Sequence, residues 1–197
     1  MSRYEGSDDY VYPGTEVLRN KADIRDQVTL EAFEADITAV RLFELLENPI
    51  EGEFDFKHLC AVHRHIFQDI YDWAGKIRTV DITRQSSRFA NAARIESYLD
   101  STLRSLREEG LLCGLKPEQF VERMAHYMGE INATHPFGDG NGRTQRSFCA
   151  QLAEQAGYFI DFETVDQPKM YEVMISSFNH DYEPLVALLN EVTAVIE

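Results

Sequence analysis

The sequence predicts a mainly α-helical domain that carries one short β-hairpin. Apolar residues recur near the helical period over most of the chain, Gly and Pro separate these runs, and only one segment is rich in β-branched residues. The 197 residues are enough to bury one hydrophobic core, and they contain no internal repeat, low-complexity tract or recognisable linker. We therefore expect a single compact domain over residues 1–197.

The N-terminal part is expected to be an arm followed by two helices. Residues 1–25 form the arm, because Pro13 and Gly14 interrupt the chain before any helical period begins. A helix is predicted over 26–47, and Asp55 can cap a second one that runs to Asp69. The apolar residues near helical spacing are Val28, Phe33, Ile37, Val40 and Leu45 in the first helix, and Leu59, Val62, Ile66 and Phe67 in the second.

The hairpin is predicted over residues 77–90, where β-branched residues from Ile77 to Thr83 precede a polar stretch. Every later segment with a periodic pattern is expected to be helical. Gly110 and Gly157 are the expected stops of two helices, and Pro117 opens another in its first turn. The predicted helices are 92–109, 117–134, 142–156, 167–178 and 182–196.

Composition excludes several functional classes. With 19 basic against 34 acidic residues and a net charge of -15, a general nucleic-acid-binding surface is not expected, although an acidic body can still carry one basic pocket. Cys60, Cys113 and Cys149 are far apart and form no CxxC pair, which favours a reducing compartment. No secretory leader or membrane-spanning run is visible, so a bacterial cytoplasmic protein is predicted; secretion as an effector by another route stays open.

The stretch INATHPFGDGNGRTQRSF, from Ile131 to Phe148, concentrates chemically active residues between two predicted helices. His135 is expected to end the first helix, because the following Pro136 disfavours helical geometry in the residue before it. The glycines at 138, 140 and 142 are expected to adopt positive φ and to let a ligand approach the backbone N–H groups. This pattern is typical of an anion-binding nest.

The charged residues of the stretch extend this prediction to a nucleotide. Arg143 and Arg146 share one face at the start of the next helix, whose N-terminus favours anions. Asp139 would repel a polyphosphate unless it helped to hold Mg²⁺, and His135 could accept a proton from an attacking hydroxyl. Transfer of a phosphate ester from a Mg-nucleotide is therefore the local hypothesis. The alternative is a plain glycine-rich connector whose arginines are solvated.

Residues 135–146 fit the pattern HPFx[DE]GNGRxxR, and the chain thereby resembles the Fic family. The segments YVYPGTEVLRNKADI, FQDIYDWAGKIRTVDI and FNHDYEPL are also similar to bacterial Fic toxins and to Fic domains of secreted effectors. The resemblance implies a Fic-type helical domain that moves AMP from ATP to a hydroxyl of a target protein, with pyrophosphate as the leaving group.

The resemblance also implies a role for each motif residue. His135 would deprotonate the target hydroxyl, and Asp139 would hold Mg²⁺ between the α- and β-phosphates. Arg143 would contact the β-phosphate side and Arg146 the γ-phosphate. The other nucleotide-binding positions, which would cradle the phosphates, are Gly138, Gly140, Asn141 and Gly142. The hairpin residues implied to dock an extended segment of the target are Thr83, Ser86, Ser87, Arg88 and Phe89.

Most proteins of this kind are restrained by a helix with the pattern [ST]xxxE[GN], whose Glu pairs with the second arginine. Residues 105–110 match it, but their place between hairpin and motif and the looseness of the pattern favour an ordinary helix end. The resemblance therefore implies a separate small antitoxin bearing that helix, and targets such as DNA gyrase or topoisomerase IV subunits. Two alternatives remain. The first is an enzyme of the same fold that transfers another nucleotide or phosphate, or that removes AMP. The second is a non-catalytic nucleotide-binding domain.

Other histidines and aromatic residues are given structural interpretations. His58, His63 and His65 lack the spacing of a metal cluster and are expected to be solvated or capping residues. His126 is expected to pack against its neighbours. Trp73 is expected to form core with Phe67 and Tyr71 before the hairpin.

Overall fold

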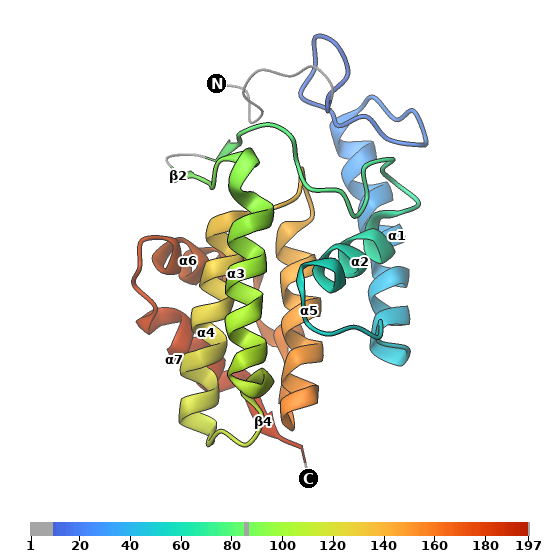
Figure 1. Ribbon diagram of the computed structural model, residues 1–197. Coiled ribbons are helices and arrows are strands. Elements are labelled where there is room, and N and C mark those ends of the chain that lie inside the picture. The colour runs from blue at the N-terminus through green and yellow to red at the C-terminus, as the bar shows by residue number, and fades with distance from the viewer. Residues whose placement is uncertain (1–9, 85–86, 197) are drawn as a thin grey trace.

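The computed structural model describes residues 10–84 and 87–196, and it confirms the mainly helical fold class (Figure 1). The α-helices are α1 (Gln27–Glu47), α2 (Phe56–Phe67), α3 (Ile95–Glu108), α4 (Pro117–Thr134), α5 (Asn141–Ala156), α6 (Gln167–Phe178) and α7 (Glu183–Val192). Short 3-10 turns lie at Ala92–Arg94, Gly110–Leu112 and Phe162–Thr164. The strands are β1 (Thr83–Arg84), β2 (Ser87–Arg88), β3 (Tyr158–Ile160) and β4 (Thr193–Val195).

The first two helices begin where their capping residues predict. The Asp26 carboxylate accepts a hydrogen bond from Thr29 N at 2.9 Å, and that of Asp55 accepts one from His58 N at 2.8 Å. Each such cap contributes about 1 kcal/mol. Of the apolar residues near helical spacing in α1, Leu45 is buried but Val28 and Val40 are exposed, and the other buried residues of this helix are Leu30 and Thr38.

Helices α4 and α5 form the centre of the bundle. Helix α4 packs against α3, α5, α6 and α7, and α5 also packs against α2. The loop 135–140 joins the end of α4 to the start of α5, at the same end of the bundle as the hairpin (Figure 1). Phe137 in this loop is buried, as are Phe120 and Phe148 on the two helices. The loop is therefore anchored to the core on both sides.

The C-terminal segment differs from its predicted single helix over 182–196. Helix α7 ends at Val192, and β4 then pairs antiparallel with β3, with Phe159 opposite Ala194. The residues Thr193-Ala-Val-Ile favour a strand, and β3 offers them an edge directly after Gly157 ends α5 at a φ of 86°. The helix predicted over 92–109 also begins later, because a 3-10 turn precedes α3.

The predicted hairpin is present but shorter than expected. Only Thr83 and Arg84 pair with Arg88 and Ser87, and residues 77–81 are not in a strand. Ser86, one of the predicted docking residues, lies outside the described residues. Across the described parts of the chain, no helix combines the length and apolar character needed to cross a membrane.

Candidate active site

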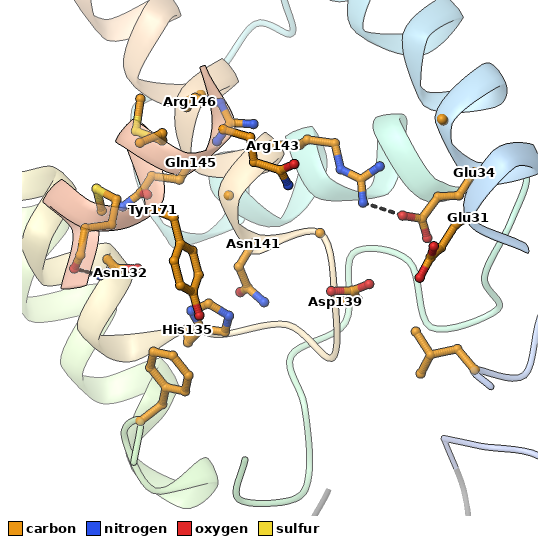
Figure 2. A pocket seen from close by; sticks show the side chains of 18 of the residues that line it. Glu31, Glu34, Asn132, His135, Asp139, Asn141, Arg143, Gln145, Arg146 and Tyr171 are labelled. Carbon is orange, nitrogen blue, oxygen red and sulfur yellow. Dashed lines mark hydrogen bonds and ion pairs between the residues drawn. The ribbon is translucent and has the colours of Figure 1, made fainter. Parts of the chain in front are cut away.

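A cavity of about 1060 Å³ opens at the N-terminus of α5 and gathers most of the predicted site (Figure 2). The predicted residues that line it are Phe89, His135, Asp139, Gly140, Asn141, Gly142, Arg143 and Arg146. Gly138 is not among the lining residues, nor is Thr83 of the hairpin. The cavity is as large as typical small-molecule sites.

His135 ends α4 in a left-handed conformation, with φ 46° and ψ 65°. Positive φ is uncommon for a residue other than glycine, and such strain is frequent at functional sites. The backbone carbonyl of His135 accepts a hydrogen bond from Arg78 Nε at 2.8 Å. Its ring stacks on Phe89 with centroids 3.9 Å apart. Arg78 and Phe89, which lie on either side of the hairpin, therefore hold His135 at the wall of the cavity.

The glycines of the loop serve different purposes. Gly140 alone among the three has positive φ, at 74°, so the expectation was wrong for Gly138 and Gly142. A Cβ on Gly140 would lie 2.2 Å from the Phe67 ring. A Cβ on Gly142 would come within 3.3 Å of Arg146 Nη1, so this glycine leaves room for the guanidinium.

Asn141 closes the loop through its side chain. Its Oδ1 accepts a hydrogen bond from Phe137 N at 2.9 Å, and its Nδ2 donates to Phe137 O at 2.8 Å. Helix α5 begins at this residue, one position earlier than predicted. The first N–H groups of a helix have no intrahelical acceptor, and the helix dipole makes this end favourable for anions. The side-chain amide of Asn141 thus holds the loop at the N-terminus of α5, where the backbone N–H groups favour an anion.

Arg143 is already paired with a carboxylate. It forms an ion pair with Glu34 of α1 (Figure 2), donates to Thr38 Oγ1 at 3.2 Å and lies 4.8 Å from the centre of the Phe67 ring. Glu34 also accepts a hydrogen bond from the Tyr71 hydroxyl. Burial, together with this carboxylate, raises the pKa of Tyr71. No sequence motif marks Glu34, because only the packing of α1 brings it to the site.

Arg146 is the second cation at the cavity and has a different environment. Burial and the nearby Arg143 lower its pKa, but an arginine remains charged at neutral pH. Within the described residues, the structure gives its guanidinium no hydrogen bond and no ion pair. Unlike Arg143, Arg146 therefore has donors available for an anion that binds in the cavity.

His63 supports Asp139 from behind the loop. Its Nδ1 accepts a hydrogen bond from Gly75 N at 2.8 Å, so Nε2 carries the proton that is donated to Asp139 O at 3.1 Å. The ring also stacks on Phe137 with centroids 3.8 Å apart. The expected solvated or capping role is wrong for His63. His58 is buried rather than solvated, but its Nδ1 accepts a hydrogen bond from Phe54 N at the start of α2, at 3.3 Å, as a capping residue would. Sequence reasoning could have found His63, because it lies four residues from both Leu59 and Phe67 on the apolar face of α2.

The buried His63 predicts a specific pH dependence. Burial lowers its pKa to about 4, from 6.5 in the unfolded chain. The unfolded chain therefore takes up this proton first as the pH falls, and protonation favours unfolding. The contribution is constant above roughly pH 6.5, and about 3 kcal/mol of stability should be lost between roughly pH 6.5 and 4. Urea unfolding across this window should show a flatter pH dependence for His63→Gln, and equal slopes would contradict the prediction.

The possible inhibitory pattern at residues 105–110 has a structural role away from the cavity. Glu109, the acid of the pattern, accepts hydrogen bonds from Arg123 Nε at 2.9 Å and from the Tyr127 hydroxyl at 2.9 Å. None of the residues 105–110 lines the cavity. The interpretation as an ordinary helix end therefore agrees with the structure.

The fold and the site define a class of protein: a helical domain with a cavity at a helix N-terminus that is lined by a histidine, two arginines and several acidic residues. The chain belongs to the Fic/DOC family, whose model matches residues 53–153. It is 43% identical over 190 residues to protein adenylyltransferase VbhT of Bartonella schoenbuchensis, covering 96% of this chain but only 40% of that protein. It is 38% identical to the probable protein adenylyltransferase Fic of Escherichia coli, covering 96% of this chain and 94% of the relative.

Solved structures agree with this assignment. The BepC protein from Bartonella tribocorum with bound AMPPNP has a TM-score of 0.89 at 25% identity, and the match covers 95% of this chain and 97% of that one. An N-terminal Fic domain from Bartonella quintana with bound ADP also has a TM-score of 0.89, at 28% identity and 95% coverage of both chains. The Fic-type fold expected from the sequence is confirmed.

Proposed function

We propose that this chain is a protein adenylyltransferase that moves AMP from ATP to a hydroxyl side chain of a target protein. The observation that carries the proposal is the meeting of His135, Asp139, two arginines and the N-terminus of α5 at one cavity. The same activity is supported by the relatives, which are protein adenylyltransferases by name, and by the AMPPNP and ADP bound in the similar solved structures. An apolar wall that would suit a nucleobase is formed by Phe162, Val165, Met170 and Met174.

The proposed reaction is a single displacement at the α-phosphorus. His135 accepts the proton of the target hydroxyl, whose oxygen forms a bond to that phosphorus. The bond from the α-phosphorus to the oxygen that bridges it to the β-phosphate breaks, and pyrophosphate leaves with both bonding electrons. Arg146 and the start of α5 would neutralise the departing charge. Arg143, held by Glu34, would contact the phosphates from the α1 side.

The residues present fit one Mg²⁺ ion. Asp139 lines the cavity next to the first turn of α5, and a single carboxylate joined by phosphate oxygens and waters is a common Mg²⁺ environment. His63 holds the backbone carbonyl of Asp139, which fixes the position of this residue. When bound, the ion would supply positive charge that offsets the repulsion between Asp139 and the phosphates.

The partners are part of the proposal. Thr83, Ser87, Arg88 and Phe89 of the hairpin, with Ser86 beyond the described residues, would hold an extended segment of the target by strand addition. A small antitoxin with an [ST]xxxE[GN] helix would place its Glu against Arg146. The setting would be the bacterial cytoplasm, the single Fic domain would span residues 1–197, and gyrase or topoisomerase IV subunits are the proposed targets.

The test uses ATP labelled at the α- or the γ-phosphate, with Mg²⁺ and a bacterial lysate. Protein-bound label from the α position alone is expected. Label from the γ position would instead indicate phosphate transfer, and label transfer from another nucleotide but not from ATP would indicate a different nucleotidyl donor. The absence of all transfer, with ATP still bound, would favour the non-catalytic alternative.

Arg146→Ala is expected to weaken ATP binding about 10- to 100-fold, because a charge-assisted hydrogen bond contributes about 1.5–3 kcal/mol. The loss should be smaller for ADP, which lacks the γ-phosphate that Arg146 is proposed to contact. Calorimetric titration with AMPPNP and ADP measures both affinities. Arg104→Ala is the matched control, since it removes the same charge from an exposed position on α3. Equal losses for the two nucleotides would contradict the assignment of Arg146 to the γ-phosphate.

A further inference from the structure

Arg78 is a fully buried arginine whose partners are backbone carbonyls. It is 1% exposed and lies in the segment that leads into the hairpin. Its Nη1 donates to Val80 O at 2.7 Å, and its Nη2 donates to Ala90 O at 2.5 Å. These two carbonyls flank the hairpin on either side. One guanidinium therefore closes the base of the hairpin.

The same guanidinium also reaches the catalytic loop. Arg78 Nε donates to His135 O at 2.8 Å, and Nη2 donates to Thr134 O at 3.2 Å. The backbone N–H of Arg78 donates to Pro136 O at 2.9 Å. The planar fork of donors in arginine suits such a set of acceptors, which a lysine ammonium cannot reproduce. Arg78 thus joins two segments that are more than fifty residues apart in the sequence.

Charge pairing does not explain the place of Arg78. The nearest Asp81 oxygen is 4.0 Å from Nη1, and the Asp81 carboxylate accepts shorter hydrogen bonds from Asn91 Nδ2 at 3.0 Å and Ala92 N at 2.8 Å. Burying a guanidinium costs free energy unless its donors are satisfied. Here the carbonyls of the hairpin base and of the loop provide that compensation.

Two further contacts join the segments that Arg78 bridges. Ala90 N donates to Ala133 O at 3.2 Å, and the Phe89 ring stacks on His135. The hairpin end and the histidine are therefore held together through both side chain and backbone. In the reaction proposed above, the hairpin would hold the target and His135 would take its proton, so their separation matters directly.

We propose that Arg78 is a positioning residue that sets the hairpin at the distance from His135 at which a docked hydroxyl meets its base. The inference rests on the proposed function. Arg78 touches no reacting atom; it acts through the carbonyls of the hairpin base and of residues 134 and 135. A misplacement of about 1 Å can lower a rate about 100-fold, so loosening this connection should impair transfer more than nucleotide binding.

The test compares Arg78→Lys with Arg123→Lys, a matched control in which an arginine ion-paired with Glu109 is replaced away from the cavity. For Arg78→Lys we expect the initial rate of α-label transfer into lysate proteins to fall by about tenfold or more. Its affinity for AMPPNP should remain within about twofold of the wild type, because the cavity residues are unchanged. Arg123→Lys should leave both quantities near their wild-type values. Transfer by Arg78→Lys within about twofold of the wild type would overturn the proposal.

Hydrogen exchange gives a readout that does not depend on activity. In Arg78→Lys, amide exchange should accelerate together in residues 78–90 and 133–137, while α3 and α5 stay protected. Uniform acceleration across the core would mean a purely structural role and would overturn the proposal. If the wild type transfers no label at all, the proposed function fails by itself, and the exchange pattern still decides whether Arg78 couples the hairpin to the loop. Should Arg78→Lys fail to fold, Arg78→Gln is measured in the same two assays.

Discussion

His135→Ala is expected to lower the rate of AMP transfer about 10²- to 10⁴-fold, the usual contribution of a general base. ATP binding should change little, because the proposed phosphate contacts come from Arg143, Arg146 and the start of α5. Single-turnover transfer of α-label measures the chemical step, and titration with AMPPNP measures binding. The combination of lost transfer and retained affinity is the expected result.

The matched control for this prediction is His126→Ala, which removes an imidazole from α4 without reaching the cavity. The His126 ring lies 5.1 Å from Tyr127 and 6.2 Å from Tyr182, in agreement with its expected packing role. Comparable losses in the two variants would mean that His135 acts through stability, and the general-base role would have to be abandoned.

Gly140→Ala is expected to disrupt both the loop and nucleotide binding. A left-handed conformation costs an alanine about 1–2 kcal/mol, and overpacking against Phe67 adds about 1–3 kcal/mol. The new methyl group would either displace the Phe67 ring, on which Arg143 lies, or shift the start of α5. Urea unfolding should therefore show a loss of several kcal/mol, with AMPPNP affinity reduced in the protein that remains folded.

Gly157→Ala is a control that separates the conformational cost of Gly140→Ala from the cost of its clash with Phe67. Gly157 also has positive φ, at 86°, but its Cβ would meet nothing within 4 Å. This variant should lose only the conformational cost of about 1–2 kcal/mol. In a double-mutant cycle, Phe67→Leu should recover part of the loss caused by Gly140→Ala, because it removes the ring from the path of the methyl group. Equal effects of the two glycine substitutions would exclude the clash as the cause.

The place of the motif residues at one cavity could be predicted from the sequence because these residues are contiguous. A helix end before Pro136, a glycine-rich turn and a helix start are local features, so the places of His135, Asp139 and Arg143 follow from neighbouring residues. The conformation within the loop was less predictable. The space around the glycines is set by side chains outside the loop: a Cβ on Gly140 would meet the Phe67 ring of α2, and one on Gly142 would meet the Arg146 guanidinium one turn along α5.

Contacts between residues that are far apart in the sequence could not be predicted from local sequence patterns. Glu34 lies 109 residues from its partner Arg143, and nothing local distinguishes it from the other acids of α1. The pairing of β3 with β4 likewise depends on a strand edge that exists only after α5 and α7 have packed. His63 is an intermediate case: its place on the apolar face of α2 was visible, but its acceptor, the carbonyl of Asp139, was not.

The ion pair between Glu34 and Arg143 joins a residue inside the segment that the family model matches to one outside it. The family model covers residues 53–153, so Glu34 on α1 and the apolar wall from residues 162–174 lie outside the matched part of the chain. The matched segment contains the proposed reacting groups, whereas the flanking segments contain Glu34, which pairs with Arg143, and the proposed surface for the nucleobase. Relatives with the same motif could therefore prefer different nucleotide donors because of these flanking segments alone. Exchanging α1 and α6 between two such relatives would then exchange their nucleotide preference.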